Sequence, residues 1–151
     1  MSERRKLNFG SLDEVMPEVD RLLVGYEAKG RWSLGQICQH LAKGLHLTVD
    51  GKPIRGYALL RWTVGPFARR HMFRTRSMPS GIKLPVASLA PGTNLDDRAE
   101  AEALRASIRV FLATDGPYTA HPIFGPLSEE EWRQLHAIHA AHHLGFLKPK
   151  S

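Results

Sequence analysis

A chain of 151 residues with 42% hydrophobic and 24% charged residues has the length and composition of one soluble globular domain, which we place at residues 1–151. No run of about 18 apolar residues occurs, and the charged N-terminus lacks the apolar stretch of a secretory signal, so we expect neither a membrane span nor a membrane partner. Cys38 is the only cysteine, which excludes an internal disulfide and makes the cytoplasm the expected location.

The net charge of +6 comes from the middle of the chain. Residues 51–95 contain eight Lys or Arg and no Asp or Glu, whereas the remaining 13 basic residues (21 minus 8) are outnumbered by 15 acidic ones. This segment makes a non-catalytic module that binds anionic ligands or nucleic acid an alternative function. It has neither a recognition-helix pattern nor the arrangement of interleaved aromatic residues of a platform for single-stranded nucleic acid, so nucleic acid is not the expected partner.

Two helices are predicted in the first third of the chain. Ser11, with Glu14 three residues later, forms a capping-box pattern, and the helix that follows should end at Gly30. Pro17 lies inside it and marks a kink or a restart. Ser33 is the cap of a second helix, through residue 49, before a turn at residues 50–53. Its expected buried stripe is Leu34, Ile37, Cys38, Leu41, Leu45 and Thr48.

The middle segment is harder to assign. Apolar spacing over residues 55–76 favours a helix broken near Gly65-Pro66, and its Tyr, Trp, Thr and Val residues make a hairpin the alternative. Three prolines and two glycines in residues 78–94 predict an extended loop.

Two more helices complete the pattern. Asp96 should start one whose core face comprises Ala103, Leu104, Ile108, Phe111 and Leu112. Ser128, with Glu131 three residues on, should start the last helix, which runs to about Leu147. The pattern predicts an all-α four-helix bundle with an extra helical excursion and Pro-rich loops between the second and third of these four helices.

Four of the eight histidines fall within residues 136–143. His139 and His143 are four apart, so they share one helix face and can bind one divalent metal. A pair of His139 with His142 is the alternative ligand set, and partly exposed surface histidines are the alternative to any metal site. Ala140 follows His139 where a thermolysin-like protease has its catalytic Glu, so that protease class is not expected.

A third histidine strengthens the metal hypothesis. His40 lies at the edge of the buried stripe of the second helix, where it can point inward. Three neutral imidazoles with open positions for water are typical of a catalytic zinc or nickel site. We expect Cys38 to be a buried core residue, the three tryptophans to be packing anchors, and His121 to support its loop.

Four motifs in order resemble a known family. The segments "RWSLGQICQHLA" and "HAAHHLGF" resemble the second-helix and last-helix signatures of DinB-like proteins. The loop at residues 78–85 and the segment "HPIFGPLSEEEW" resemble one uncharacterised subfamily, domain of unknown function 1569. The resemblance covers residues 7–147.

This resemblance implies an up-down-down-up four-helix bundle with a divalent metal on His40, His139 and His143. Characterised DinB-like relatives include transferases and an isomerase that use low-molecular-weight thiols, whereas the subfamily itself implies no activity. Our leading hypothesis is a metal-dependent hydrolase or a thiol-dependent transferase with an unknown small-molecule substrate, and a homodimer is expected by analogy. A metal on three His lowers the pKa of a bound water or thiol. The arginines of residues 51–95 could bind the carboxylates of such a thiol, or they could be solvated or paired with acidic helices. A catalytically silent structural or dimerising protein, with its histidines closed off from solvent, is the third hypothesis.

Overall fold

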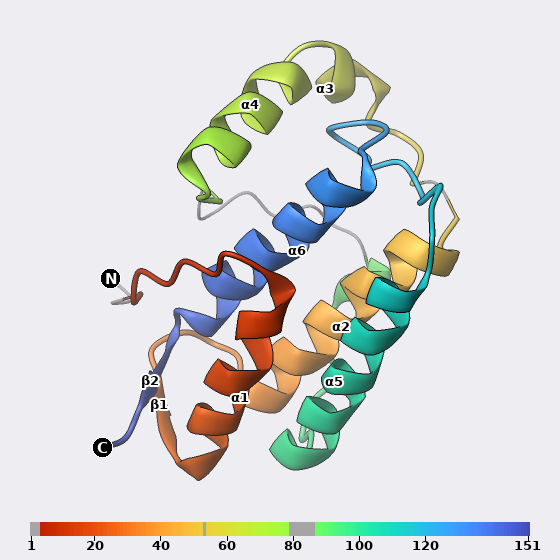
Figure 1. The fold of residues 1–151 in the computed structure, drawn as a ribbon. Coiled ribbons are helices and arrows are strands. Elements are labelled where there is room, and N and C mark those ends of the chain that lie inside the picture. Colours follow the sequence, from red (N-terminus) through yellow and green to blue (C-terminus); the bar gives the residue numbers. More distant parts are fainter. Residues whose placement is uncertain (1–3, 53, 79–86) are drawn as a thin grey trace.

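The computed structural model describes residues 4–52, 54–78 and 87–151, and these are mostly helical. Helices α1 (Val15–Val24), α2 (Leu34–Asp50), α5 (Asp97–Ala113) and α6 (Glu129–Leu144) pack around a shared apolar core (Figure 1). In this view α1 and α6 run in one direction, and α2 and α5 run in the other. None of the described helices has the length and apolarity needed to cross a membrane.

The predicted helix starts are confirmed for α2, α5 and α6. The Ser33 hydroxyl accepts the Gln36 N–H at 3.2 Å, and the Gln36 side chain accepts the Ser33 N–H at 3.0 Å. Ser128 and Glu131 make the same reciprocal pair at 3.1 and 3.2 Å, and Asp96 caps α5 at 2.8 Å. These caps satisfy N–H groups that the helix itself leaves unpaired. They therefore fix where α2 and α6, the two helices that carry the candidate ligands, begin.

The core faces follow the predicted stripes with one correction. All six predicted residues of α2 are buried. On α5, Leu104, Ile108 and Phe111 are buried as predicted, but Ala103 and Leu112 are exposed. The buried positions are instead Ala101, Leu104, Ser107, Ile108 and Phe111, whose spacing defines one narrow helical stripe facing the core.

The first and the last helix each end earlier than predicted. Helix α1 ends at Val24 rather than Gly30, and α6 ends at Leu144 rather than Leu147. The residues beyond them form strands β1 (Tyr26–Ala28) and β2 (Leu147–Pro149), which pair antiparallel with Tyr26 opposite Pro149. The all-α class is therefore corrected to a mostly helical fold with a small two-stranded sheet. Fully buried Leu147 anchors this pairing in the core.

The first helix begins in two steps. A 3₁₀ turn, η1 (Leu12–Glu14), precedes α1, so the change of helix type falls at Val15 rather than at Pro17. Pro17 lies in the first turn of α1, where its missing N–H has no helical acceptor to lose.

The middle segment is helical, and the hairpin alternative was wrong. Helices α3 (Ala58–Trp62) and α4 (Gly65–Thr75) are separated at the predicted break, with Pro66 in the first turn of α4. In the view of Figure 1 they lie above α6, and Arg69 of α4 contacts Glu131 of α6. Trp62 is 84% exposed, so it is not the packing anchor that we expected. Within the predicted loop, η2 (Ala87–Leu89) is a 3₁₀ turn, and residues 79–86 lie outside the described part of the chain.

Asp97 joins three elements at the start of α2. Its carboxylate accepts the Gly35 N–H at 2.7 Å and the Tyr26 hydroxyl at 2.9 Å, and the same Tyr26 oxygen accepts the Leu34 N–H at 3.0 Å. A Cβ on Gly35 would lie 3.0 Å from an Asp97 oxygen, so close packing explains this glycine. The negative charge also lies at the positive end of the α2 dipole. This network fixes the start of α2 relative to β1 and α5, and hence the position of His40 along the helix.

His136 is a buried histidine with a structural role. It is 7% exposed, its Nε2 lies 3.0 Å from Thr48 Oγ1, and its ring stacks on Trp132. The Thr48 hydroxyl donates to the Gly44 carbonyl, so its oxygen is free to accept the His136 Nε2–H. Burial, with His121 as the second cause, lowers the pKa of His136 to about 3. The folded state therefore holds a neutral ring that the unfolded chain protonates below pH 6.5.

We predict that this ring makes the protein acid-sensitive. Between the unfolded pKa of 6.5 and the folded value of about 3, the unfolded state binds more protons. The free energy of unfolding should therefore decrease as the pH is lowered, by about 2 kcal/mol for this one group between pH 7 and pH 5. Urea denaturation of chelator-treated protein at a series of pH values measures this slope. His136→Gln, which keeps a donor for Thr48, should flatten it, with His71→Gln at the surface as the control. An equal slope in native protein and His136→Gln would contradict the prediction.

Candidate metal centre

The four histidines of α6 have three separate environments. His136 faces the core and Thr48, as described above. His142 turns toward Phe146, with ring centroids 5.7 Å apart. His139 and His143 face α2, which places the predicted pair on one side and leaves His142 outside the cluster. The alternative pair of His139 with His142 is therefore not the one assembled.

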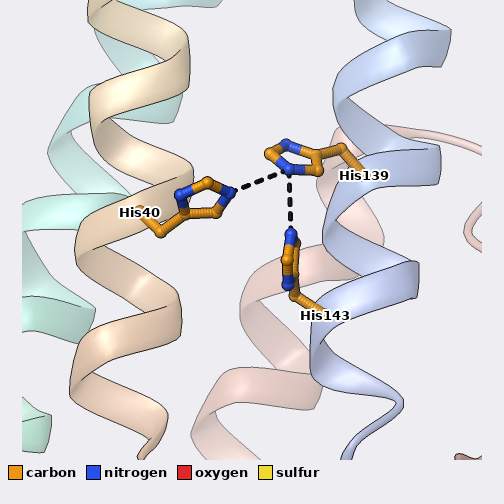
Figure 2. Close-up of side chains that lie close together, drawn as sticks. All are labelled: His40, His139 and His143. Atoms are coloured by element: carbon orange, nitrogen blue, oxygen red, sulfur yellow. Dashed lines mark hydrogen bonds between the residues drawn. The ribbon is translucent and has the colours of Figure 1, made fainter. Parts of the chain in front are cut away.

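Three imidazoles from two helices converge at one point (Figure 2). His40 comes from α2, and its Nε2 lies 3.0 Å from His139 Nε2. His143 Nε2 also lies 3.0 Å from His139 Nε2. All three ligand nitrogens lie within 4.8 Å of one another. Nitrogens that share a zinc ion at about 2.0–2.1 Å are separated by roughly 3.3 Å, so small ring rotations suffice to seat an ion.

The orientation of the His40 ring is fixed by the backbone of η2. His40 Nδ1 lies 2.7 Å from the Leu89 carbonyl oxygen, which can only accept a hydrogen bond. Nδ1 therefore carries the proton of the neutral ring, and Nε2 presents its lone pair to the cluster. Protein metal sites commonly orient ligating histidines by this kind of outer hydrogen bond.

Counting the ring protons shows that the two nitrogen–nitrogen contacts of the cluster cannot both be hydrogen bonds. His40 Nε2 has no hydrogen, so its contact with His139 requires the His139 proton at Nε2. That single N–H then cannot also be well directed at His143 Nε2, which lies 3.0 Å from the same nitrogen. If His139 Nε2 is unprotonated instead, two lone pairs face each other across the contact with His40. A cation at the common point would turn all three lone pairs into ligands.

Electrostatics keep these rings neutral, as metal binding requires. Burial is the largest cause of a pKa for His139 well below 6.5, and the neighbouring histidines lower it further. Burial, with His40 as the next cause, lowers the pKa of His143 to about 3. Burial also lowers the pKa of His40, although its hydrogen bond to Leu89 acts in the opposite direction. The three neutral nitrogens therefore need not lose a proton to bind a cation at neutral pH.

The cluster is partly open to solvent and has one aromatic wall. His139 and His143 are partly exposed, whereas His40 is buried. The Trp32 ring stacks on His143 at 5.3 Å and lies 4.9 Å from the His40 ring. Partial exposure argues against the third hypothesis, in which the histidines are closed off from solvent.

Two cations from outside residues 51–95 act on the cluster. Arg4 lowers the pKa of His143 and Lys43 lowers that of His40, so both charges act on the cluster. Arg61 instead donates to the carbonyls of His121 and Pro122, and Arg69 pairs with Glu131.

Sequence reasoning identified the three imidazoles but missed their support. Trp32 forms one wall of the cluster in addition to its predicted packing role, and the Leu89 carbonyl, which no sequence pattern indicates, orients His40. A backbone acceptor has no side-chain signature, so only the fold reveals it. Cys38 is buried in the core as predicted, and burial raises the pKa of its thiol to about 12. His121 has the loop-supporting role that we expected, since its Nδ1 accepts the N–H groups of Ile123 and Phe124 at 3.0 Å.

Comparison with known proteins identifies one family. The family model described as a protein of unknown function (DUF1569) matches residues 1–150. Comparisons with curated proteins and with solved structures gave no match.

We predict that, in metal-free protein at neutral pH, His40 is the Nδ1–H tautomer. The Leu89 carbonyl 2.7 Å away stabilises this form, whereas a free imidazole in water prefers a proton on the other nitrogen. Long-range proton–nitrogen NMR correlations of nitrogen-15-labelled, chelator-treated protein distinguish the two tautomers. A His40 ring protonated at Nε2 would contradict the assigned orientation.

Proposed function

The chain belongs to the DUF1569 family, and on that premise we propose that it is a metal protein in which His40, His139 and His143 hold one divalent ion. The observation that carries the proposal is the convergence of three neutral imidazoles, of which His40 is oriented by the Leu89 carbonyl. The two nitrogen–nitrogen contacts that meet at His139 Nε2 cannot both be hydrogen bonds. Imidazole donors suit zinc and nickel, which are our expected metals.

We also propose that the family has the DinB-like four-helix bundle with up-down-down-up topology. The directions of α1, α2, α5 and α6 support this assignment (Figure 1). The distribution of candidate ligands, one on the second long helix and two on the last, supports it as well.

The activity that the site supports best is a metal-dependent hydrolysis or a transfer involving a thiol. Three protein ligands leave coordination positions open, and the partly exposed cluster can be reached by a small molecule. When bound, zinc or nickel supplies Lewis acidity that lowers the pKa of a water or thiol to near neutrality. For this chain we assign Trp32 to one wall of the substrate site and Arg4 and Lys43 to the attraction of an anionic substrate or thiol.

We predict that protein purified without a polyhistidine tag binds about one zinc ion per chain. His139→Ala removes the central ligand and should weaken zinc binding at least about 100-fold. His40→Ala should behave similarly, because it removes the ligand contributed by α2. Isothermal titration and elemental analysis measure affinity and stoichiometry.

His142→Ala is the matched control, since it removes an imidazole from the same helix that lies outside the cluster. It should retain the zinc affinity of the native protein. Stoichiometric metal in His40→Ala or His139→Ala at native affinity would refute the proposed ligand set.

The activity is tested separately on zinc-loaded protein. A chromogenic ester tests hydrolysis, and a low-molecular-weight thiol with an alkylating electrophile tests transfer. We expect one of these rates to depend on zinc and to be lost in His139→Ala but not in His142→Ala. A protein that binds zinc tightly but accelerates neither reaction would restrict the proposal to metal binding and count against the enzymatic assignment.

A further inference from the structure

A second candidate site lies at the other end of α6 from the histidine cluster. A pocket of about 460 Å³ opens between α4, the start of α6 and the turn at residues 121–125. Glu131 at its edge precedes His139 by eight residues, or about 12 Å along the helix. The lining includes Arg61, Arg69, Arg70, Phe73, Phe124 and Glu131.

The turn that forms one wall is the segment "HPIFG", whose role the metal site does not explain. The His121 and Gly125 backbones exchange two hydrogen bonds of 2.9 Å, and Gly125 has a φ of +75°, which favours glycine. The His121 ring accepts two N–H groups inside the turn and stacks on Phe124 at 4.3 Å. This turn therefore holds the Phe124 ring rigidly at the pocket.

Helix α4 is pressed directly against the same turn. A Cβ on Gly65 would lie 2.5 Å from the Ile123 carbonyl oxygen, closer than any side chain could pack. Glycine at this position brings the first turn of α4 against the wall. The side chains that line the pocket are therefore carried by a helix and a turn whose backbones are in close contact.

Arg61 is held in place with spare hydrogen-bonding capacity. Its Nη2 donates to the carbonyls of His121 and Pro122 at 3.5 and 3.3 Å, and its Nε is buried without a partner among the described residues. Because the guanidinium is already oriented, a ligand would lose less side-chain entropy on binding it.

The charges around the pocket favour an anion. Arg69 binds Glu131 through Nε and Nη2, which fixes both side chains and neutralises one charge. Arg61 and Arg70 remain without an acidic partner among the described residues, so the lining carries a net charge of about +2. Phe73 and Phe124 add apolar surface beside these guanidinium groups.

We propose that this pocket binds a small organic anion, with its carboxylate or phosphate group on Arg61 and Arg70 and an apolar or aromatic group against Phe73 and Phe124. Guanidinium groups suit both kinds of oxyanion, because their fork can make two parallel hydrogen bonds. This binding needs no metal and is independent of the proposed function of the histidine cluster.

Benzoate and phenyl phosphate serve as probes, with neutral benzamide as the control for the aromatic ring and inorganic phosphate as the control for the anion. Titrations of the full chain followed by NMR or calorimetry should show saturable binding of benzoate or phenyl phosphate, and weaker binding of benzamide and inorganic phosphate. Preference for one of the first two probes identifies the acid group. Absence of saturable binding by both overturns the proposal.

The matched variants are Arg70→Gln and Arg74→Gln. Both remove one charge from an exposed position on α4, but only Arg70 lines the pocket. Arg70→Gln should weaken binding about fivefold or more, and Arg74→Gln less than twofold. Equal loss in both variants would indicate diffuse charge attraction and overturn the site. Binding should persist in His139→Ala; its loss there would assign the anion to the metal centre and overturn this proposal too.

Discussion

Three imidazole nitrogens brought to one point inside a folded chain impose a strong constraint, because each neutral ring has a single proton. His40 directs its proton away from the cluster, to the Leu89 carbonyl, which leaves its inner nitrogen able only to accept. His139 Nε2 then faces this acceptor and also a second ring nitrogen, that of His143. Protonating a ring would relieve the shortage, but burial lowers all three pKa values. A bound cation satisfies all three nitrogens without this cost, which is why the geometry favours a metal over a polar core.

The framework that places these rings follows local rules, so most of it could be predicted from the sequence. Ser33, Asp96 and Ser128 each start a helix through side-chain hydrogen bonds made within one turn. Once the starts of α2 and α6 are fixed, the 3.6-residue period sets the direction of every later side chain. His40 and the His139–His143 pair were therefore predictable as inward-facing residues, although their meeting depends on how α2 packs against α6.

The features that were missed depend on contacts between distant parts of the chain. Strands β1 and β2 are three residues each and pair across more than a hundred residues, so neither has a detectable period of its own. Trp62 was assigned to the core because it is aromatic, yet α3 lies outside the main helical packing and leaves it exposed. The Leu89 carbonyl orients His40 from a short 3₁₀ turn, and a backbone oxygen is present at every position. The apolar period of a helix predicts which side chains share a face, but not which distant segments of the chain contact that face.

Helix α6 combines two kinds of histidine chemistry in one length of chain. Toward its start, Trp132 and His136 join His121 in a stack of neutral rings that packs the core and supports the turn beside the basic pocket. About one and two turns after His136, the rings of His139 and His143 face His40 with nitrogens that have too few protons to pair. The difference lies in the partners rather than in the residue: His136 has one oxygen of Thr48 for its one proton, whereas His139 Nε2 faces the ring nitrogens of both His40 and His143 with at most one proton. A cluster of histidines in a sequence is therefore evidence for a metal only at the positions where the folded chain leaves the ring nitrogens without other hydrogen-bond partners.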